Sequence, residues 1–246
     1  MNKIALITGA SGGVGRAVAA EMAADGWTLV LAGRDASRLR EVHGSDHFLV
    51  EADCSTYAGA RHIVQAAGAA GLHPTALAHC VGNIRLGAMH RMSEADFMDC
   101  LSANLISAFH TLAAFIEHLR HQKQTGAAVL VSSAAARIGT PNHEAIAAAK
   151  AGVEGLVRGA AATHAPFGIR INAVAPGIMD TPASAALLSN DSAREAAARQ
   201  YPLPGIGSSA QLAGLIAWLL SEKSARVTGE IWAMDGGFSA IRPLVK

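Results

Sequence analysis

The stretch T-G-A-S-G-G-V-G, residues 8–15, directly follows a short apolar run, I-A-L-I, at residues 4–7. A helical pattern begins within this stretch and continues to about residue 25. Glycines between a strand and a helix let the backbone come close to a phosphate group, and the free amide groups of the helix start face that anion. The stretch therefore predicts a dinucleotide-binding turn after the first strand of a parallel sheet.

The rest of the chain alternates short apolar runs with helical patterns. Strands are expected at residues 28–32, 48–52, 76–81, 127–133, 169–176 and 230–235, and helices near 36–43, 56–70, 93–123, 145–164 and 209–221. Parallel neighbours need long crossover connections, so this alternation predicts an α/β fold, a Rossmann-type doubly wound parallel sheet in three α/β/α layers. We expect one domain over residues 1–246, with a substrate lid around 178–207.

Composition and charge exclude several classes of partner. The chain has 20 basic and 19 acidic residues with no long run of either, which gives no electrostatic footprint for nucleic acid. We also expect no segment long enough to span a membrane and no metal site. Cys54, Cys80 and Cys100 are an odd number without metal-ligand spacing, which favours free thiols and the cytoplasm. The expected partner is a small-molecule substrate.

Selectivity for the nucleotide is indicated by L-A-G-R-D, residues 31–35, at the end of the second strand. An acidic side chain at this strand tip would bind the ribose hydroxyls of NAD, but Gly33 is followed by Arg34, whose guanidinium suits the 2′-phosphate of NADP. NADP is therefore favoured over NAD. The alternative is that Arg34 is a solvated side chain paired with Asp35 and binds no phosphate. Asp53, after the third strand, suits the adenine amino group or a simple turn cap.

With these residues in view, the chain resembles the short-chain dehydrogenase/reductase family, and within it the 3-oxoacyl-(acyl carrier protein) reductases, along essentially its whole length. The matching positions include the glycine turn, Asn104 in the long central helix, Ser133 after the fifth strand, Lys150, and N-A-V-A-P-G at residues 172–177. The stretch V-T-G-E-I-W-A-M-D-G-G, residues 227–237, resembles the family's last strand. The resemblance implies that Asn104, Ser133 and Lys150 are catalytic.

The glycine turn and the resemblance together imply a set of cofactor contacts along the carboxyl edge of the sheet. These contacts are Gly9, Ser11, Gly13, Val14, Gly15, Arg34, Asp53, Cys54, Gly82, Lys150, Pro176, Gly177, Ile178 and Thr181.

Two positions depart from the family. The fourth strand ends H-C-V-G, residues 79–82, where the family has Asn-Asn-Ala-Gly, so the hydrogen bonds of that strand must be rearranged. The family's tyrosine, four residues before the lysine, is replaced by Ile146, and counting forward from Ser133 reaches the same residue. In the family this tyrosine protonates the substrate carbonyl while the serine holds it. Loss of one positioned acid costs about 10²- to 10⁴-fold in rate.

Another group would then have to supply the proton. His143 lies seven residues before Lys150, and if the helix has begun by residue 143 both side chains leave the same face. This spacing is also that of the tyrosine in the family's enoyl-reductase branch. A histidine that only caps the helix or is solvated is the alternative. Tyr57 and Tyr201, the only tyrosines, lie at the start of another helix and at the end of the lid.

Two functions follow from this pattern. The first is an NADP-dependent oxidoreductase acting on a small carbonyl, alcohol, enone or 3-oxoacyl-like substrate through an altered proton relay. The second is a catalytically silent NADP-binding subunit, a sensor or the structural partner of an active homologue; a family enzyme inactivated by the substitution is a third reading. The Ala- and Gly-rich helix 145–164 permits close helix packing, and the resemblance implies a homo-oligomer, a dimer of dimers.

Overall fold

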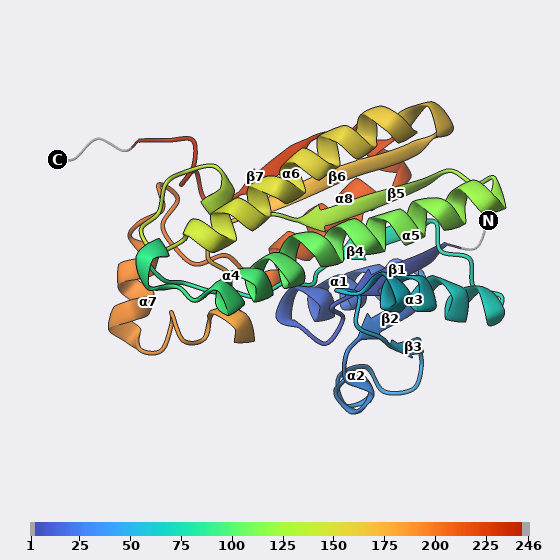
Figure 1. Cartoon of the computed structure of the whole chain (residues 1–246), viewed down its shortest axis with the longest axis horizontal. Helices are drawn as coiled ribbons and strands as arrows, with labels where there is room; N and C mark the ends of the chain where they lie inside the picture. Colours follow the sequence, from blue (N-terminus) through green and yellow to red (C-terminus); the bar gives the residue numbers. More distant parts are fainter. Residues whose placement is uncertain (1–2, 243–246) are drawn as a thin grey trace.

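The computed structural model describes residues 3–242 and contains one sheet of seven parallel strands, in the order β3-β2-β1-β4-β5-β6-β7 (Figure 1). The strands are β1 (Ile4–Thr8), β2 (Thr28–Gly33), β3 (Phe48–Glu51), β4 (Ala76–His79), β5 (Gly126–Val131), β6 (Ile169–Pro176) and β7 (Ile231–Met234). The order reverses between β1 and β4, which places a ligand-binding crevice at the carboxyl ends of these two strands. This confirms the predicted doubly wound α/β fold.

Helices cover both faces of the sheet. One face packs against α3 (Tyr57–Ala69), α5 (Ser107–Gln122) and α6 (Glu144–His164), and the other against α1 (Gly13–Ala24), α2 (Ala36–His43) and α8 (Ser209–Leu220). Alternate strand residues serve the two cores, because Leu6 of β1 packs into the first and Ala5 and Ile7 into the second. A strand buried on both sides must be apolar throughout, which explains the continuous run at residues 4–7.

The long central helix contains an irregular turn. It consists of α4 (Glu94–Leu101), a π-helical turn at Ser102–Ile106 and α5, so the prediction of one helix over 93–123 was right in extent but missed the π turn. Ser93 caps its start by accepting a hydrogen bond from the Asp96 amide, and Lys123 ends it in a left-handed conformation. π turns inside helices are frequent at functional sites, and Asn104 lies in this one.

One expectation about membranes needs correction. Residues Glu94–Gln122 form a helix of 29 residues that is long and apolar enough to cross a bilayer by length and composition alone. Half of its most apolar window is buried inside the protein, and α5 side chains such as Leu112 and Phe115 belong to the main core. A helix that is buried in a protein core can meet the same criterion of length and composition. That criterion alone therefore does not show that the segment crosses a membrane.

The segment predicted as a lid contains a 3₁₀ turn at Pro182–Ser184 and α7 (Asp191–Ala198), and Figure 1 shows it at one end of the molecule. A single bridge between Met179 and Gly207 joins the beginning and end of this segment. Its action as a lid stays a prediction. The three cysteines are free thiols, as predicted.

Candidate active site

The glycine turn is shaped by contacts that leave no room for side chains. Gly9 has a φ of 68°, and a Cβ there would lie 2.8 Å from the Cys80 carbonyl oxygen. A Cβ at Gly15 would lie 2.2 Å from the carbonyl oxygen of Gly9. Glycine is therefore required at both positions for the turn to pack against β4 and for α1 to begin close to it.

The start of α1 presents unpaired donors. Gly12 occupies the N-cap without a side chain to bond the helix start, and the first helical hydrogen bond joins the Arg16 amide to the Gly12 carbonyl at 2.9 Å. Within residues 3–242, the amides of Gly13, Val14 and Gly15 donate to no backbone carbonyl. No acidic residue occupies the first turn. These features form a cradle for an anion such as a pyrophosphate.

A cleft of about 460 Å³ opens beside this turn, along the carboxyl ends of the first four strands. Six of the predicted cofactor contacts line it: Gly9, Ser11, Arg34, Asp53, Cys54 and Gly82. The lining also includes Arg38, Ser55, Asn83, Arg85 and Asp99, which were not among the contacts predicted from the sequence. Arg38 was detectable in principle, since it follows Arg34 by four residues at a helix start.

Two arginines that follow β2, Arg34 and Arg38, line the cleft. Asp35 caps α2 by accepting a hydrogen bond from the Arg38 amide at 3.0 Å, and no ion pair between Arg34 and Asp35 occurs in the described part of the chain. Partial burial raises the pKa of Asp53, but hydrogen bonds from Ser55 and the charge of Arg34 outweigh it and hold the pKa below its usual value. Asp53 thus caps its turn and also lies within the field of the arginine.

The loop after β6 closes over the glycine turn. A Cβ at Gly13 would lie 2.9 Å from the Cβ of Thr181, so these two predicted cofactor contacts meet although 168 positions separate them. β6 ends at Pro176, and a Cβ at Gly177 would lie 2.7 Å from the ring of Tyr201. The amide of Ile178 donates to the Tyr201 hydroxyl at 2.7 Å. Tyr201 therefore fixes the loop that begins at Gly177.

Asn104 and Lys150 approach the same point beside Gly82. A Cβ at Gly82 would lie 2.5 Å from Asn104 Oδ1 and 3.3 Å from Lys150 Nζ. Asn104 Oδ1 is buried and has no hydrogen-bond partner in the described residues. An unpaired buried acceptor next to a cation leaves capacity for a water or a ligand hydroxyl at this point.

Lys150 is held by the sheet. Its Nζ donates to the Val131 carbonyl at 2.7 Å, and two further N–H groups remain for other acceptors. Burial lowers the pKa of Lys150 to about 8, and the thiols of Cys100 and Cys80 oppose this shift. The ammonium group is therefore still mostly protonated at neutral pH.

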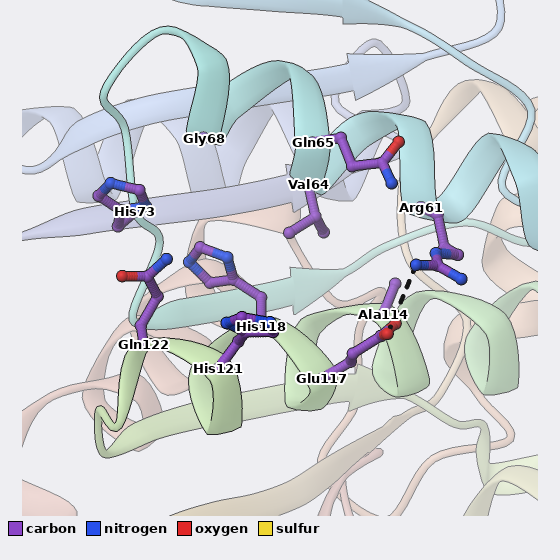
Figure 2. Close-up of a pocket in the computed structure, with 10 residues that line it drawn as sticks. All are labelled: Arg61, Val64, Gln65, Gly68, His73, Ala114, Glu117, His118, His121 and Gln122. Atoms are coloured by element: carbon purple, nitrogen blue, oxygen red, sulfur yellow. Dashed lines mark ion pairs between the residues drawn. The ribbon is translucent and has the colours of Figure 1, made fainter.

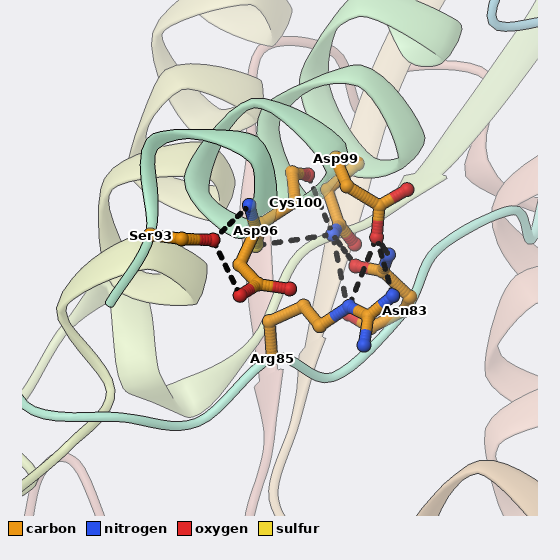
Figure 3. A network of polar contacts seen from close by, with 7 residues as sticks. Asn83, Arg85, Ser93, Asp96, Asp99 and Cys100 are labelled. Carbon is orange, nitrogen blue, oxygen red and sulfur yellow. Dashed lines mark hydrogen bonds and ion pairs between the residues drawn. The ribbon is translucent and has the colours of Figure 1, made fainter. Parts of the chain in front are cut away.

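A polar network that includes Asn83, Arg85, Asp99 and Cys100 (Figure 3) runs back to the cleft, and Asn104 is bonded to it. Its Nδ2 donates to Asn83 Oδ1 and to the Cys100 carbonyl, both at 2.9 Å. Asn83 Nδ2 donates to Asp99 at 2.8 Å, and the same carboxylate oxygen accepts from Arg85 Nε at 2.9 Å. The amide nitrogen of Asn104 is used in this network, and its oxygen is left unpaired beside Gly82.

The two serines after β5 have different surroundings. Ser132 is buried and donates to Glu154 Oε1 of α6 at 3.1 Å. Ser133 is half-buried and caps a short 3₁₀ turn by accepting from the Ala135 amide at 3.2 Å, which leaves its hydroxyl proton free. Of the pair, Ser133 has the hydroxyl proton available for a substrate oxygen, and its catalytic role stays a prediction.

Ile146 has a packing role. Its side chain is only 5% exposed and belongs to a small apolar cluster with Cys100, Ala145 and Ala149, against which Leu86 and Met92 pack. A hydrocarbon cannot donate a proton, and the neighbours of this one are also apolar. The structure therefore fills the position with core instead of a replacement acid.

The alternative proton donors are placed as follows. α6 begins at Glu144, so His143 is its N-cap, and the condition that the helix has begun by residue 143 is not met. His143 Nδ1 donates to the Pro141 carbonyl at 2.8 Å, and Nε2 has no hydrogen bond within residues 3–242. Burial, with the charge of Asp235, raises the pKa of Tyr201 despite its bond from Ile178. Tyr57 is half exposed and packs edge-on against His110.

A second groove, of about 360 Å³, lies between α3 and α5 and is lined by His73, His118 and His121 (Figure 2). His73 precedes β4, so this groove lies at the amino ends of the strands, away from the crevice where sheets of this kind bind ligands. Within the described residues, no group of three or more His, Cys, Asp or Glu side chains is arranged to hold a metal ion.

A parallel sheet with an anion cradle at its switch point, and an Asn–Ser–Lys set beside it, defines a dinucleotide-binding protein of the oxidoreductase type. The model of the family described as enoyl-(acyl carrier protein) reductase matches residues 9–239, and the chain belongs to the short-chain dehydrogenase/reductase family.

Relatives of known name support this assignment. The chain is 31% identical over 245 residues to 3-oxoacyl-(acyl-carrier-protein) reductase FabG of Pseudomonas aeruginosa, covering 96% of each. It is also 31% identical over 250 residues to the uncharacterized oxidoreductase YmfI of Bacillus subtilis, covering 97% of this chain and 99% of that one. A putative gluconate dehydrogenase from Agrobacterium tumefaciens superposes with a TM-score of 0.91 at 26% identity, over 98% and 97% of the two chains.

Proposed function

We propose that the protein is an NADP-dependent oxidoreductase that transfers hydride to or from a small carbonyl or alcohol, or a 3-oxoacyl-like substrate, through an altered proton relay. The observation that carries this proposal is a phosphate cradle at the start of α1 beside a cleft that Arg34 and Arg38 line. Paired guanidinium groups suit the 2′-phosphate that distinguishes NADP from NAD.

The residues present fit this cofactor. The amides of Gly13, Val14 and Gly15 suit its pyrophosphate, Asp53 its adenine, and the unpaired Asn104 Oδ1 beside Lys150 a hydroxyl at its nicotinamide end. When bound, the cofactor supplies the hydride. The chain's own part is then to hold the substrate oxygen through the Ser133 hydroxyl and to provide the proton.

His143 is the proposed proton donor. Because its Nδ1–H is bonded to the Pro141 carbonyl, the second nitrogen, Nε2, is the one that can carry and release a proton toward a substrate. An imidazolium can act as a general acid, and a positioned general acid is worth about 10²- to 10⁴-fold in rate. We do not assign this role to Tyr201, whose hydroxyl binds the Ile178 amide.

The substrate class, assembly and location are part of the same proposal. The names of the FabG relatives favour a 3-oxoacyl-like substrate. Added methyl groups at Gly155 and Gly159 of α6 would meet no atom within 4 Å, so this helix offers a flat strip for a second copy, in a homo-oligomer of the dimer-of-dimers kind. Free thiols suit the cytoplasm.

A second candidate is favoured by Ile146. Its burial in an apolar cluster shows that the position is filled by packing, which is what a catalytically silent NADP-binding subunit would need. Such a subunit would sense the cofactor or support an active homologue.

One pair of measurements decides between them. NADPH and NADH are titrated by fluorescence, and cofactor oxidation is then followed against ketones, enones and 3-oxoacyl thioesters, for the natural chain and for Ile146→Tyr. We expect NADPH binding by both chains and turnover by both. Turnover by the variant alone supports the silent subunit. If neither NADPH nor NADH binds, both proposed functions are overturned.

A test of the donor itself uses His143→Ala, with Tyr57→Phe as a control for a remote ring. The expected result is a loss of about 10²-fold or more in turnover with unchanged NADPH affinity, and an unchanged turnover removes His143 from the mechanism.

A further inference from the structure

His79 ends β4 and is only 2% exposed, at the position where the sequence departs from the family's Asn-Asn-Ala-Gly. Both ring nitrogens are bonded. Nδ1 lies 2.8 Å from Thr8 Oγ1, at the end of β1, and Nε2 lies 3.2 Å from Ser107 Oγ, at the start of α5. The imidazole therefore bridges the strand that leads into the glycine turn and the helix that leads out of the π turn.

The direction of each hydrogen bond follows from the last one. The Ser107 hydroxyl donates to the Ala103 carbonyl at 2.7 Å, so its oxygen can only accept from His79 Nε2–H. Nδ1 then carries a lone pair and accepts the Thr8 hydroxyl proton. The chain of bonds runs one way, from Thr8 through His79 and Ser107 to Ala103.

The far end of this chain explains the π turn. The Ser107 amide bonds to the Ser102 carbonyl five residues back, and not to the Ala103 carbonyl four residues back as in an α-helix. The Ser107 side chain, and not its amide, bonds to the Ala103 carbonyl, since the hydroxyl donates to it at 2.7 Å. Asn104, whose orientation the site depends on, is the next residue. The π turn is thus stabilised from the side by a buried histidine on the neighbouring strand.

His79 stays neutral in this environment. Burial, together with the charge of Lys150, lowers the pKa of His79 to about 3. A neutral ring with one donor and one acceptor is the form that both bonds require. A purely apolar side chain would leave the buried hydroxyls of Thr8 and Ser107 without these partners.

We infer that His79 is a positioning residue, which holds the π turn and its Asn104 in register with the phosphate-binding turn. The inference rests on the proposed function insofar as that register serves cofactor binding. His79, which is itself a departure from the family's sequence, thereby links the phosphate-binding turn to the π turn.

The first test reads the ring itself and needs no activity. In the full chain labelled with ¹⁵N-histidine, long-range ¹H–¹⁵N correlations, assigned by comparison with His79→Gln, should show one neutral tautomer with the proton on Nε2 from about pH 5.5 to 8.5. A proton on Nδ1, or titration of this ring within that range, overturns the inference.

The second test measures coupling. Ser107 does not line the cleft, yet we expect Ser107→Ala to weaken NADPH binding roughly three- to tenfold in the natural chain and by less than about 1.5-fold in a His79→Leu background. Thr163→Ala is the matched control, because Thr163 makes the same hydroxyl bond to a carbonyl four residues back, that of Gly159, on the exposed side of α6.

His79→Gln, which keeps one donor and one acceptor, should restore NADPH affinity to within about threefold of the natural chain when compared with His79→Leu. Equal effects of Ser107→Ala in both backgrounds overturn the inference. If the natural chain binds no NADPH, the proposed function fails; the same cycle is then read from urea unfolding, where additive effects of Ser107→Ala and His79→Leu overturn the inference.

Discussion

The dinucleotide side and the substrate side of this molecule occupy the same edge of one sheet, on either side of β4, but they depart from the family very differently. On the dinucleotide side, the sequence resembles the family, and Gly9, Ser11 and Gly12 of the glycine turn line one cleft with Asp53 and Gly82. On the substrate side, the resemblance assigns Ser133, Asn104 and Lys150 to catalysis, and Ile146, which lies where the resemblance expects the acid, packs in an apolar cluster. The proposed function thus treats binding and proton transfer as separable on this fold.

The physical reason lies in what each side is made of. The dinucleotide side depends on free backbone amides and on glycines, whose missing side chains leave room for a phosphate. Several positions must therefore keep suitable residues at the same time. Proton transfer depends on one functional group, and replacing it with a hydrocarbon of suitable shape leaves the packing intact. One substitution can thus change the chemistry of such a site without disturbing its fold.

The largest effect is expected from Gly15→Ala. The new Cβ would lie 2.2 Å from the Gly9 carbonyl oxygen, so the turn must move, and NADPH affinity should fall by about 100-fold or more in fluorescence titration. Gly214→Ala, the same change in α8 where the nearest atom is 4.0 Å away, should leave affinity unchanged and add up to about 1 kcal/mol of stability. Equal affinities for the two variants would show that the cleft does not hold the phosphates.

The counterpart on the substrate side is Ile146→Ala. It removes a buried side chain from the cluster of Cys100, Ala145 and Ala149 and should lower the free energy of unfolding by about 2–4 kcal/mol in urea titration. Ile146→Val should cost only about 0.5–1.5 kcal/mol, and NADPH affinity should hold in both. A strong loss of affinity would mean that the two sides are not separable.

A smaller effect concerns the choice of coenzyme. Arg34→Ala and Arg38→Ala should each weaken NADPH binding about 10- to 100-fold with NADH binding unchanged, because each removes a charged donor from the 2′-phosphate. Arg40→Ala, on the same helix but outside the cleft lining, serves as the control. If NADH binding falls in parallel, the arginines support the cleft without selecting the phosphate.

The smallest effect is a pH dependence that belongs to His79. Its pKa is lowered from 6.5 to about 3 in the folded protein, so the unfolded chain takes up this proton first as the pH falls. The stability that His79 contributes is therefore complete above about pH 6.5 and declines below it by at most about 1.4 kcal/mol per pH unit. The stability difference between the natural chain and His79→Gln, measured by urea unfolding, should shrink from pH 7 to 5. A difference that does not change with pH would show that the ring is not buried as described.

The fold was predictable because hydrophobic periodicity and strand-helix alternation are local properties of the chain. The same holds for the glycine turn, where a run of adjacent residues carries the signal. Contacts between distant segments were not predictable, such as Thr181 against Gly13 or the bonds of His79 to Thr8 and Ser107. The sequence could show that the fourth strand departs from the family, but only the packing showed which groups replace the missing bonds.

The start of α6 illustrates the same limit. Pairing His143 with Lys150 by spacing assumed regular helix through residue 143, whereas the helix begins one residue later. Element boundaries depend on competing caps and turns, and here Asn142, with a φ of 63°, ends the preceding loop just before the cap. The role of His143 remains a proposal for the kinetic test.

The π turn at residues 102–106 is, in effect, one extra residue inserted into an otherwise continuous helix. Deleting a single residue there would return the segment to regular α-helix and change the direction in which Asn104, inside the turn, presents its side chain. The geometry of the site is thus encoded partly in chain length, so homologues that differ by one insertion or deletion here would differ in chemistry even where every named side chain is retained.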